Sequence, residues 1–150
     1  MNFRTLRGAV PDGKAFKAYL MKRLCVPENH IMTLFDHNAT RAEIIKGFRK
    51  LRDNGEIKEG DPIFIFFAGH GSQKSPHPGW GLGGRNVQIE VILPYDCGAL
   101  TEEHPKGVEP IPDHTISILI DEIAAKKGNN IVSTCCDLPA FFSFFTHAFI

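Results

Sequence analysis

A histidine between two glycines, directly after an apolar run, is the feature of this sequence best suited to do chemistry. Residues 63–67 are all Ile or Phe, and Ala68 and the triplet Gly69-His70-Gly71 follow them. A short run of this kind, stopped by glycine, predicts a strand buried on both faces of a parallel sheet. Open α/β sheets bind ligands at the carboxyl ends of their strands, where His70 lies. His70 is therefore a candidate for proton transfer near neutral pH, and a histidine that caps a loop fits the pattern equally well.

The sequence around this histidine resembles the histidine motif of the caspase and metacaspase clan of cysteine peptidases (peptidase C14). The similarity covers about residues 5–130 and is greatest to the metacaspase-like domains of fungi. It rests on Phe66-Phe67-Ala68-Gly69-His70-Gly71-Ser72, Leu6-Arg7-Gly8, Leu93-Pro94-Tyr95-Asp96 and Ile111-Pro112-Asp113. The resemblance implies a caspase-like three-layer α/β/α fold with a mostly parallel sheet. It also implies that the catalytic domain is truncated, being incomplete at both ends.

The resemblance assigns roles to the residues of the histidine motif. His70 would protonate the leaving amine of a cleaved peptide, and the backbone N–H of Gly71 would be an oxyanion donor. The family places its cysteine at the end of the next parallel strand, in a motif of the form Asp-x-Cys-His-Ser-Gly, which this sequence lacks. Cys135 and Cys136 follow His70 by 65 and 66 residues. We take Cys136, slightly ahead of Cys135, as the candidate nucleophile, and purely structural thiols are the alternative.

The segment around these cysteines departs from the family pattern. Thr134 stands where the Asp should be, and Asp137-Leu138-Pro139 replaces His-Ser-Gly. After Lys127 there is no Lys or Arg, and Val132-Ser133 is a pair whose codons can resemble a 5′ splice site. We therefore divide the chain into a partial peptidase domain, 1–131, and an atypical tail, 132–150, of the kind that an unspliced intron or a frameshift produces.

The implied function is that of a cysteine endopeptidase, which hydrolyses peptide bonds after Arg or Lys with a Cys-His dyad. We expect little or no activity from the chain as written, because the nucleophile motif is missing. The alternative is a catalytically dead, caspase-like interaction or regulatory module. The implied partner is a protein or peptide substrate. The resemblance also implies the family's association with apoptosis, but no residue of this sequence indicates that process.

Acidic and sulfur-containing side chains supply further candidates. Asp96 follows a predicted strand and could bind a basic substrate side chain or help to bind calcium, which activates some members of the family; a turn-capping role is at least as plausible. We expect no other cofactor and no metal site, because the histidines have no short ligand spacing. Cys97 is interpreted as a bystander and Cys25 as a core residue.

Bulk composition excludes several classes of protein. The 150 residues fit one domain, and 17 basic residues balance 17 acidic ones. This balance argues against a nucleic-acid partner or a polybasic membrane patch. No apolar run approaches the roughly 20 residues of a membrane span, and the start lacks the apolar core of a signal peptide. Four cysteines without framework spacing indicate reduced thiols and a cytoplasmic protein. Composition does not give the oligomeric state.

The predicted elements alternate between helices and strands. Asp12 is expected to cap a helix to about residue 24, and Thr40 with Glu43 forms a capping box for a helix to about residue 52. Asp113 is expected to cap a third helix, which Gly128 ends. Strands are predicted at 30–35, 62–68, 87–93 and 131–132, with a loop at 72–85. Alternation of this kind predicts parallel pairing through right-handed crossovers.

Overall fold

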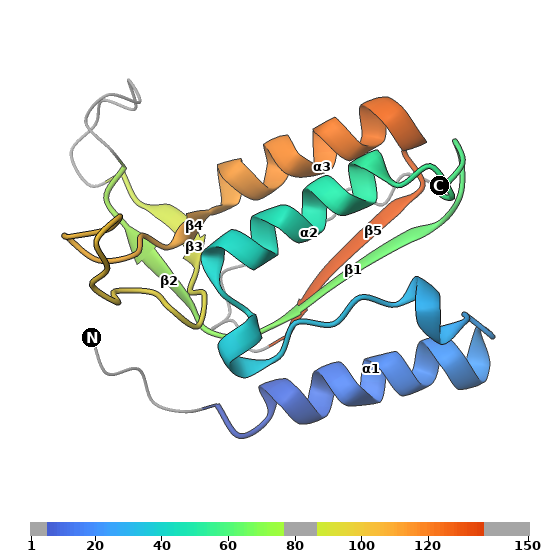
Figure 1. The fold of residues 1–150 in the computed structure, drawn as a ribbon, viewed down its shortest axis with the longest axis horizontal. Coiled ribbons are helices and arrows are strands. Elements are labelled where there is room, and N and C mark those ends of the chain that lie inside the picture. Colours follow the sequence, from blue (N-terminus) through green and yellow to red (C-terminus); the bar gives the residue numbers. More distant parts are fainter. Residues whose placement is uncertain (1–5, 77–86, 137–150) are drawn as a thin grey trace.

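The computed structural model describes residues 6–76 and 87–136 as three layers (Figure 1). Strands β1 (Ile63–Ala68) and β5 (Ile131–Cys136) pair in parallel and form the middle layer. Helix α1 (Ala9–Arg23) covers one face of this sheet, and α2 (Arg41–Asp53) and α3 (Asp113–Lys127) lie side by side on the other. The expected caspase-like α/β fold, with helices on both faces of a parallel sheet, is confirmed.

A second, antiparallel sheet continues from the carboxyl end of β1. It consists of β2 (Gly71–Lys74), β3 (Ile89–Ile92) and β4 (Ile111–Pro112), in that order. The prediction of a loop from residue 72 onward was wrong for Ser72, Gln73 and Lys74, which are mostly exposed and pair along β3. The prediction that the strands pair in parallel through crossover helices was also wrong for this sheet. Strands β2, β3 and β4 pair antiparallel, without crossover helices. Residues 77–86 lie outside the described residues.

The helix boundaries follow local capping chemistry in two of the three helices. The hydroxyl of Thr40 accepts a hydrogen bond from the Glu43 N–H at 3.3 Å, which confirms the predicted N-cap of α2. Gly128 ends α3 as predicted, with φ of 83°. The prediction for Asp12 was wrong, because α1 already begins at Ala9 and Asp12 lies in its first turn. Likewise Asp113 is the first residue of α3, and Pro112 occupies the N-cap.

The segment predicted as a strand at 30–35 is not one. A 3₁₀ turn, η1, occupies Glu28–His30, and a second, η2, occupies Asp36–Asn38. The residues between them are extended, but no described strand pairs with them. Cys25 is exposed rather than buried in the core, and it adopts a left-handed φ of 54° two residues after the last residue of α1.

The main core lies between the central sheet and the pair α2–α3. Its buried members are Phe48 of α2, Ile63 of β1, and Leu119 and Ile123 of α3. On the opposite face, the ring of Phe16 in α1 stacks on Phe66 of β1 at 4.5 Å between centroids. Apolar contacts on both faces of β1 fit its continuous apolar run, although only Ile63 is fully buried and Phe64 is 42% exposed.

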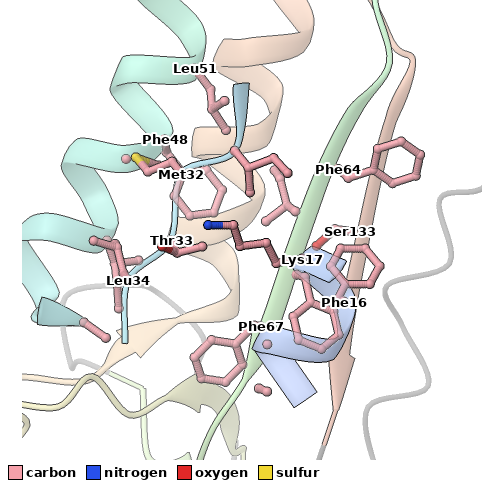
Figure 2. Close-up of a pocket in the computed structure, with 18 of the residues that line it drawn as sticks. Phe16, Lys17, Met32, Thr33, Leu34, Phe48, Leu51, Phe64, Phe67 and Ser133 are labelled. Carbon is pink, nitrogen blue, oxygen red and sulfur yellow. The ribbon is translucent and has the colours of Figure 1, made fainter. Parts of the chain in front are cut away.

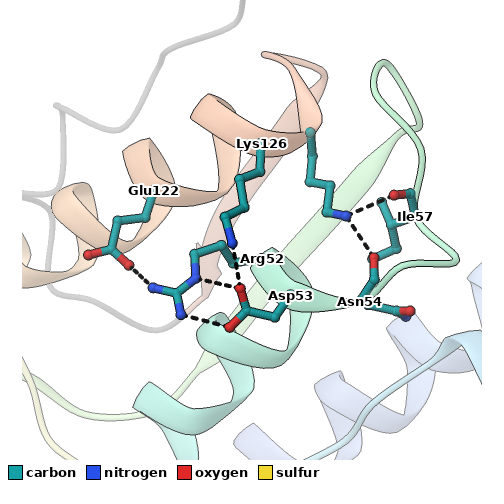
Figure 3. Close-up of polar contacts among 7 residues, drawn as sticks. Arg52, Asp53, Asn54, Ile57, Glu122 and Lys126 are labelled. Carbon is teal, nitrogen blue, oxygen red and sulfur yellow. Dashed lines mark hydrogen bonds and ion pairs between the residues drawn. The ribbon is translucent and has the colours of Figure 1, made fainter.

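The end of α3 is tied to the loop that leads into β1 (Figure 3). The Lys127 ammonium donates to the carbonyls of Asn54 and Ile57 at 2.7 and 2.9 Å, and its side chain is buried. Backbone bonds continue this connection, because the Gly60 N–H donates to the Lys127 carbonyl at 2.7 Å. These contacts hold the amino ends of β1 and β5 together.

Exposed ion pairs join α2 and α3 on the surface of the protein. Arg52 of α2 bonds Glu122 of α3 at 2.6 Å, and Asp53 bonds both Arg52 and Lys126 (Figure 3). The hydrogen bond from Arg52, followed by that from Lys126, holds the pKa of Asp53 well below its usual range. Pairs this exposed add little stability.

Strand β5 is longer than the two residues expected from the sequence. All six residues pair with β1, from Ile131 opposite Ile63 to Cys136 opposite Ala68. The apolar pattern of β5 stops after Val132, but backbone pairing continues through Ser133 and Thr134. Residues 137–150 lie outside the described residues, so the interpretation of 132–150 as an intron- or frameshift-derived tail stays a prediction. No helix in the described part of the chain is long and apolar enough to cross a bilayer.

Candidate active site

The sequence-predicted histidine and cysteines lie at one edge of the central sheet. Strands β1 and β5 are direct neighbours and run in the same direction, with Phe67 opposite Cys135 and Ala68 opposite Cys136. His70 comes two residues after the end of β1. The carboxyl ends of the two strands therefore bring the backbones of His70, Cys135 and Cys136 to the same region.

The backbone of His70 is fixed at the corner between the two sheets. Its carbonyl accepts a hydrogen bond from the Leu93 N–H at 2.9 Å, and β2 begins at the next residue. Gly69 permits this corner, because a Cβ atom at that position would lie 2.6 Å from Cζ of the Phe67 ring. His70 itself is half-buried.

The pairing of β2 with β3 also decides where the Gly71 N–H points. His70 and Leu93 form a hydrogen-bonded pair, and the next pair along the ladder is Gly71 with Ile92. Hydrogen-bonded and non-hydrogen-bonded pairs alternate in an antiparallel ladder. The Gly71 N–H therefore points away from β3 and is not used by that ladder, as an oxyanion donor requires.

Asp96 is bonded to the start of α2. Its Oδ1 accepts a hydrogen bond from the backbone N–H of Arg41 at 2.8 Å, and the neighbouring Tyr95 N–H donates to the Ala39 carbonyl at 2.9 Å. This contact gives Asp96 a capping role for α2, in addition to the turn that holds it. A role in substrate or calcium binding would have to use the rest of the carboxylate.

Cys97 lies in the loop after β3, and Cys25 follows the end of α1. Cys97 is partly buried, and burial raises the pKa of its thiol, with further increases from the carboxylates of Glu109 and Asp96. A raised pKa disfavours the nucleophilic thiolate. Within residues 6–76 and 87–136, no three His, Cys, Asp or Glu side chains gather as metal ligands.

Two supporting residues were not identified from the sequence. Leu93 holds the His70 carbonyl, and Arg41 holds Asp96. Both use backbone N–H groups, so their side chains carry no signal of the role. The one signal in the sequence was that Leu93 stands at the end of a predicted strand, where residues of the site were expected.

Comparison with known proteins identifies the family. The family model for the metacaspase, peptidase C14 domain matches residues 1–137. Metacaspase-9 of Arabidopsis thaliana is 26% identical over 133 residues, which cover 82% of this chain and 39% of that protein. Metacaspase-3 of the same plant is 25% identical over 147 residues, covering 90% of this chain and 37% of that protein. The chain thus spans less than two fifths of the length of these relatives. From the match of the family model and the arrangement of His70 and β5, the chain belongs to the metacaspase family of the peptidase C14 group.

Proposed function

We propose that this chain carries part of the active site of a cysteine endopeptidase, with His70 as the general acid and base. The observation that carries the proposal is the parallel pairing of β1 with β5, which ends at Ala68 and Cys136. A thiolate at the end of β5 would attack the peptide carbonyl and form a thioester. His70 would give its proton to the leaving amine, and water would then hydrolyse the thioester.

Gly71 and Asp96 have supporting roles in this proposal. The N–H of Gly71 is directed away from the β2–β3 ladder and would donate to the oxyanion. Asp96 would contribute to the recognition of Arg or Lys before the cleaved bond, as the family resemblance implies. Calcium activation has only the family resemblance as support.

We expect the chain as written to turn over slowly or not at all. Thr134 and Asp137-Leu138-Pro139 replace the family's residues around the cysteine. Proline lacks an N–H and restricts the backbone, so Pro139 is unsuited to a turn that supplies oxyanion donors. The test is a fluorogenic Arg or Lys peptide, assayed with and without calcium.

A repaired variant makes the proposal falsifiable. Thr134→Asp, Asp137→His, Leu138→Ser and Pro139→Gly together restore the motif around Cys136. This variant should react with a peptide electrophile carrying Arg, and His70→Ala should lower its rate by roughly 100- to 10,000-fold. Cys135→Ala should leave the rate unchanged and Cys136→Ala should abolish it. A folded repaired variant whose reaction is indifferent to His70 would refute the assignment.

The second candidate is a catalytically inactive interaction or regulatory module. The sequence around Cys136 favours it, because the family's nucleophile motif is missing there. Sequencing the transcript from the codon of Lys127 onward separates the two candidates. Splicing into an Asp-x-Cys-His-Ser-Gly turn would favour the peptidase, and read-through to Ile150 would favour the inactive module.

A further inference from the structure

The loop between α2 and β1 carries the Asn-Gly pair Asn54-Gly55. In such a pair the backbone nitrogen of the glycine can attack Cγ of the asparagine carboxamide. A new C–N bond closes a succinimide ring, and the carboxamide nitrogen leaves as ammonia, taking up the proton of the glycine N–H. Water then opens the ring at either carbonyl carbon, which leaves aspartate or isoaspartate at position 54.

The surroundings of Asn54 leave room for this reaction. Gly55 has no Cβ to hinder the attack, and a Cβ placed there would meet no atom within 4 Å. Both residues are exposed to water, and Asn54 also borders a cavity of about 1900 Å³, part of which Figure 2 shows. The other asparagines of the sequence precede Phe, His, Ala, Val, Asn or Ile, each of which has a side chain. Access of the attacking nitrogen therefore favours position 54.

The folded backbone nevertheless holds Asn54 away from the reactive geometry. The ring is nearly planar, so its closure requires the Gly55 nitrogen to rotate to the side of the Asn54 Cβ. At the observed ψ of 113°, the carbonyl oxygen of Asn54 is the atom nearer to Cβ, and the Gly55 nitrogen points away from it. The Asn54 Oδ1 also accepts a hydrogen bond from the Glu56 N–H at 2.9 Å, which fixes the carboxamide in a turn. The backbone must therefore rotate at Asn54 before the ring can form.

Lys127 holds the Asn54 carbonyl in its unreactive orientation (Figure 3). The Lys127 Nζ donates to that carbonyl at 2.7 Å and to the Ile57 carbonyl at 2.9 Å, and its side chain is buried. Rotation about the Cα–C bond of Asn54 swings the carbonyl away from the ammonium, so this hydrogen bond must break first. Because a hydrogen bond to a charged group changes an equilibrium constant by roughly 10- to 100-fold, the reactive conformation is correspondingly rare.

We propose that Asn54 is a modification site at which isoaspartate forms, and that its hydrogen bond with Lys127 controls the rate. While the end of α3 is docked on the loop, the reaction is suppressed. When the loop opens, the ring closes and the change becomes permanent, so the modified fraction records how often α3 and the loop have separated. This proposal concerns the scaffold and does not depend on the proposed peptidase activity.

The isoaspartate should in turn weaken the docking of α3 on the loop. It adds one carbon to the main chain between positions 54 and 55, and a carboxylate replaces the carbonyl that Lys127 binds. Lys127 bonds positions 54 and 57 together, and the added carbon changes the spacing between them. Modified chains should therefore open at this loop more often than unmodified ones.

The test follows the modification of the full chain at pH 7.5, below its unfolding temperature. Proteolytic digestion and electron-transfer mass spectrometry distinguish asparagine, aspartate and isoaspartate at position 54 and give the rate. A synthetic peptide of residues 50–59 gives the rate without the fold. The folded chain should react at least about tenfold more slowly than the peptide. Equal rates would overturn the proposal, because the fold would then not control the reaction.

A matched pair of lysine variants tests the role of Lys127. Lys127→Met removes the hydrogen bond to Asn54 and should raise the rate at least about tenfold, toward that of the peptide. Lys126→Met removes a lysine from the same turn whose side chain is 56% exposed, and should change the rate by less than about twofold. A Lys127→Met chain that reacts no faster than the Lys126→Met chain would refute the assigned role.

A core variant separates local opening of the loop from global unfolding. Leu119→Ala removes buried contacts of α3 and so lowers the Tm, but it leaves Lys127 and the loop in place. At a temperature where both variants are folded, Leu119→Ala should accelerate the reaction far less than Lys127→Met does. Equal acceleration would overturn the proposal, because the reaction would then take place in the unfolded chain. The comparison of the wild-type chain with the peptide decides the question if Lys127→Met does not fold.

Two further measurements test the chemistry and its effect. Gly55→Ala should slow the reaction at position 54 in the chain and in the peptide, because it adds a Cβ beside the attacking nitrogen. Ion exchange separates modified from unmodified chains by their charge, and the isoaspartate form should have a Tm several degrees lower. Faster modification at another asparagine would refute the choice of site, and an unchanged Tm would refute the effect on α3.

Discussion

The Lys127 ammonium makes a contact whose removal should measurably destabilise the fold. Its side chain is only 8% exposed, and its Nζ donates to the carbonyls of Asn54 and Ile57. Lys127→Met keeps most of the apolar stem and removes the charge and both hydrogen bonds. The affected carbonyls lie in the loop that leads from α2 into β1.

The magnitude follows from the two lost hydrogen bonds. A hydrogen bond to a charged group contributes about 1.5–3 kcal/mol, and an orphaned acceptor adds to the loss unless water reaches it. Asn54 is exposed, so water can replace the ammonium at its carbonyl. We therefore expect Lys127→Met to lower the unfolding free energy by about 3 kcal/mol, which is the sum of two such bonds at the lower end of this range. For a domain of this size that lowers the Tm by about 10 °C.

The neighbouring lysine provides the control. Lys126 is also in the last turn of α3, but its side chain is 56% exposed and pairs with Asp53 on the surface. Lys126→Met should leave the Tm within the error of the measurement, because exposed pairs contribute little. Urea and thermal unfolding of both variants decide the matter. Equal Tm values for the two variants would refute the argument that the two Lys127 hydrogen bonds stabilise the fold.

Three further predictions test other parts of the structure. Gly128→Ala should lower the unfolding free energy by about 2 kcal/mol, because φ is 83° there and an added Cβ would lie 3.2 Å from the Gly60 nitrogen. Gly55 has open space around it, so Gly55→Ala should cost under about 0.5 kcal/mol. Similar losses for both variants would argue against backbone strain at Gly128. At pH 7.5, mass spectrometry after brief alkylation should find Cys25 modified several times faster than Cys97, because Cys25 is exposed and burial raises the pKa of Cys97; a faster Cys97 would contradict this. Burial, with a smaller effect from Asp113, raises the pKa of Glu90, so the ionised carboxylate is disfavoured in the folded state above the usual Glu pKa. Glu90→Gln should therefore raise the Tm by roughly 1–2 °C at pH 7. At pH 3.5 it should leave the Tm unchanged, because the carboxyl group is then protonated in both the folded and the unfolded state. A gain of equal size at both pH values would rule out ionisation of Glu90 as its cause.

The sequence predicted the elements whose signals are local. The run of Ile and Phe marked β1, Thr40 with Glu43 marked the start of α2, and Gly128 marked the end of α3. Each of these signals depends on a residue type acting on its immediate neighbours. The placement of His70 at a strand end followed from β1 directly.

Elements that depend on a distant partner were predicted less well. Ser72, Gln73 and Lys74 have no apolar alternation, and they are a strand only because β3 lies beside them. Residues 31–35 have a strand-like composition, but no described strand lies beside them to complete the pairing. The capping role of Asp96 depends on Arg41, 55 positions earlier in the chain, and no local pattern announces it.

The pairing of β1 with β5 has a consequence for folding during synthesis. Ile63 and Ile131 are 68 residues apart, so β1 leaves the ribosome long before its partner exists. At about 5–20 residues per second, this interval lasts roughly 3–14 s. During that time the apolar strand β1 lacks the partner with which it pairs in the folded chain, a state prone to aggregation. Chaperone capture of nascent chains should therefore peak after β1 emerges and fall once residue 136 is free of the ribosome.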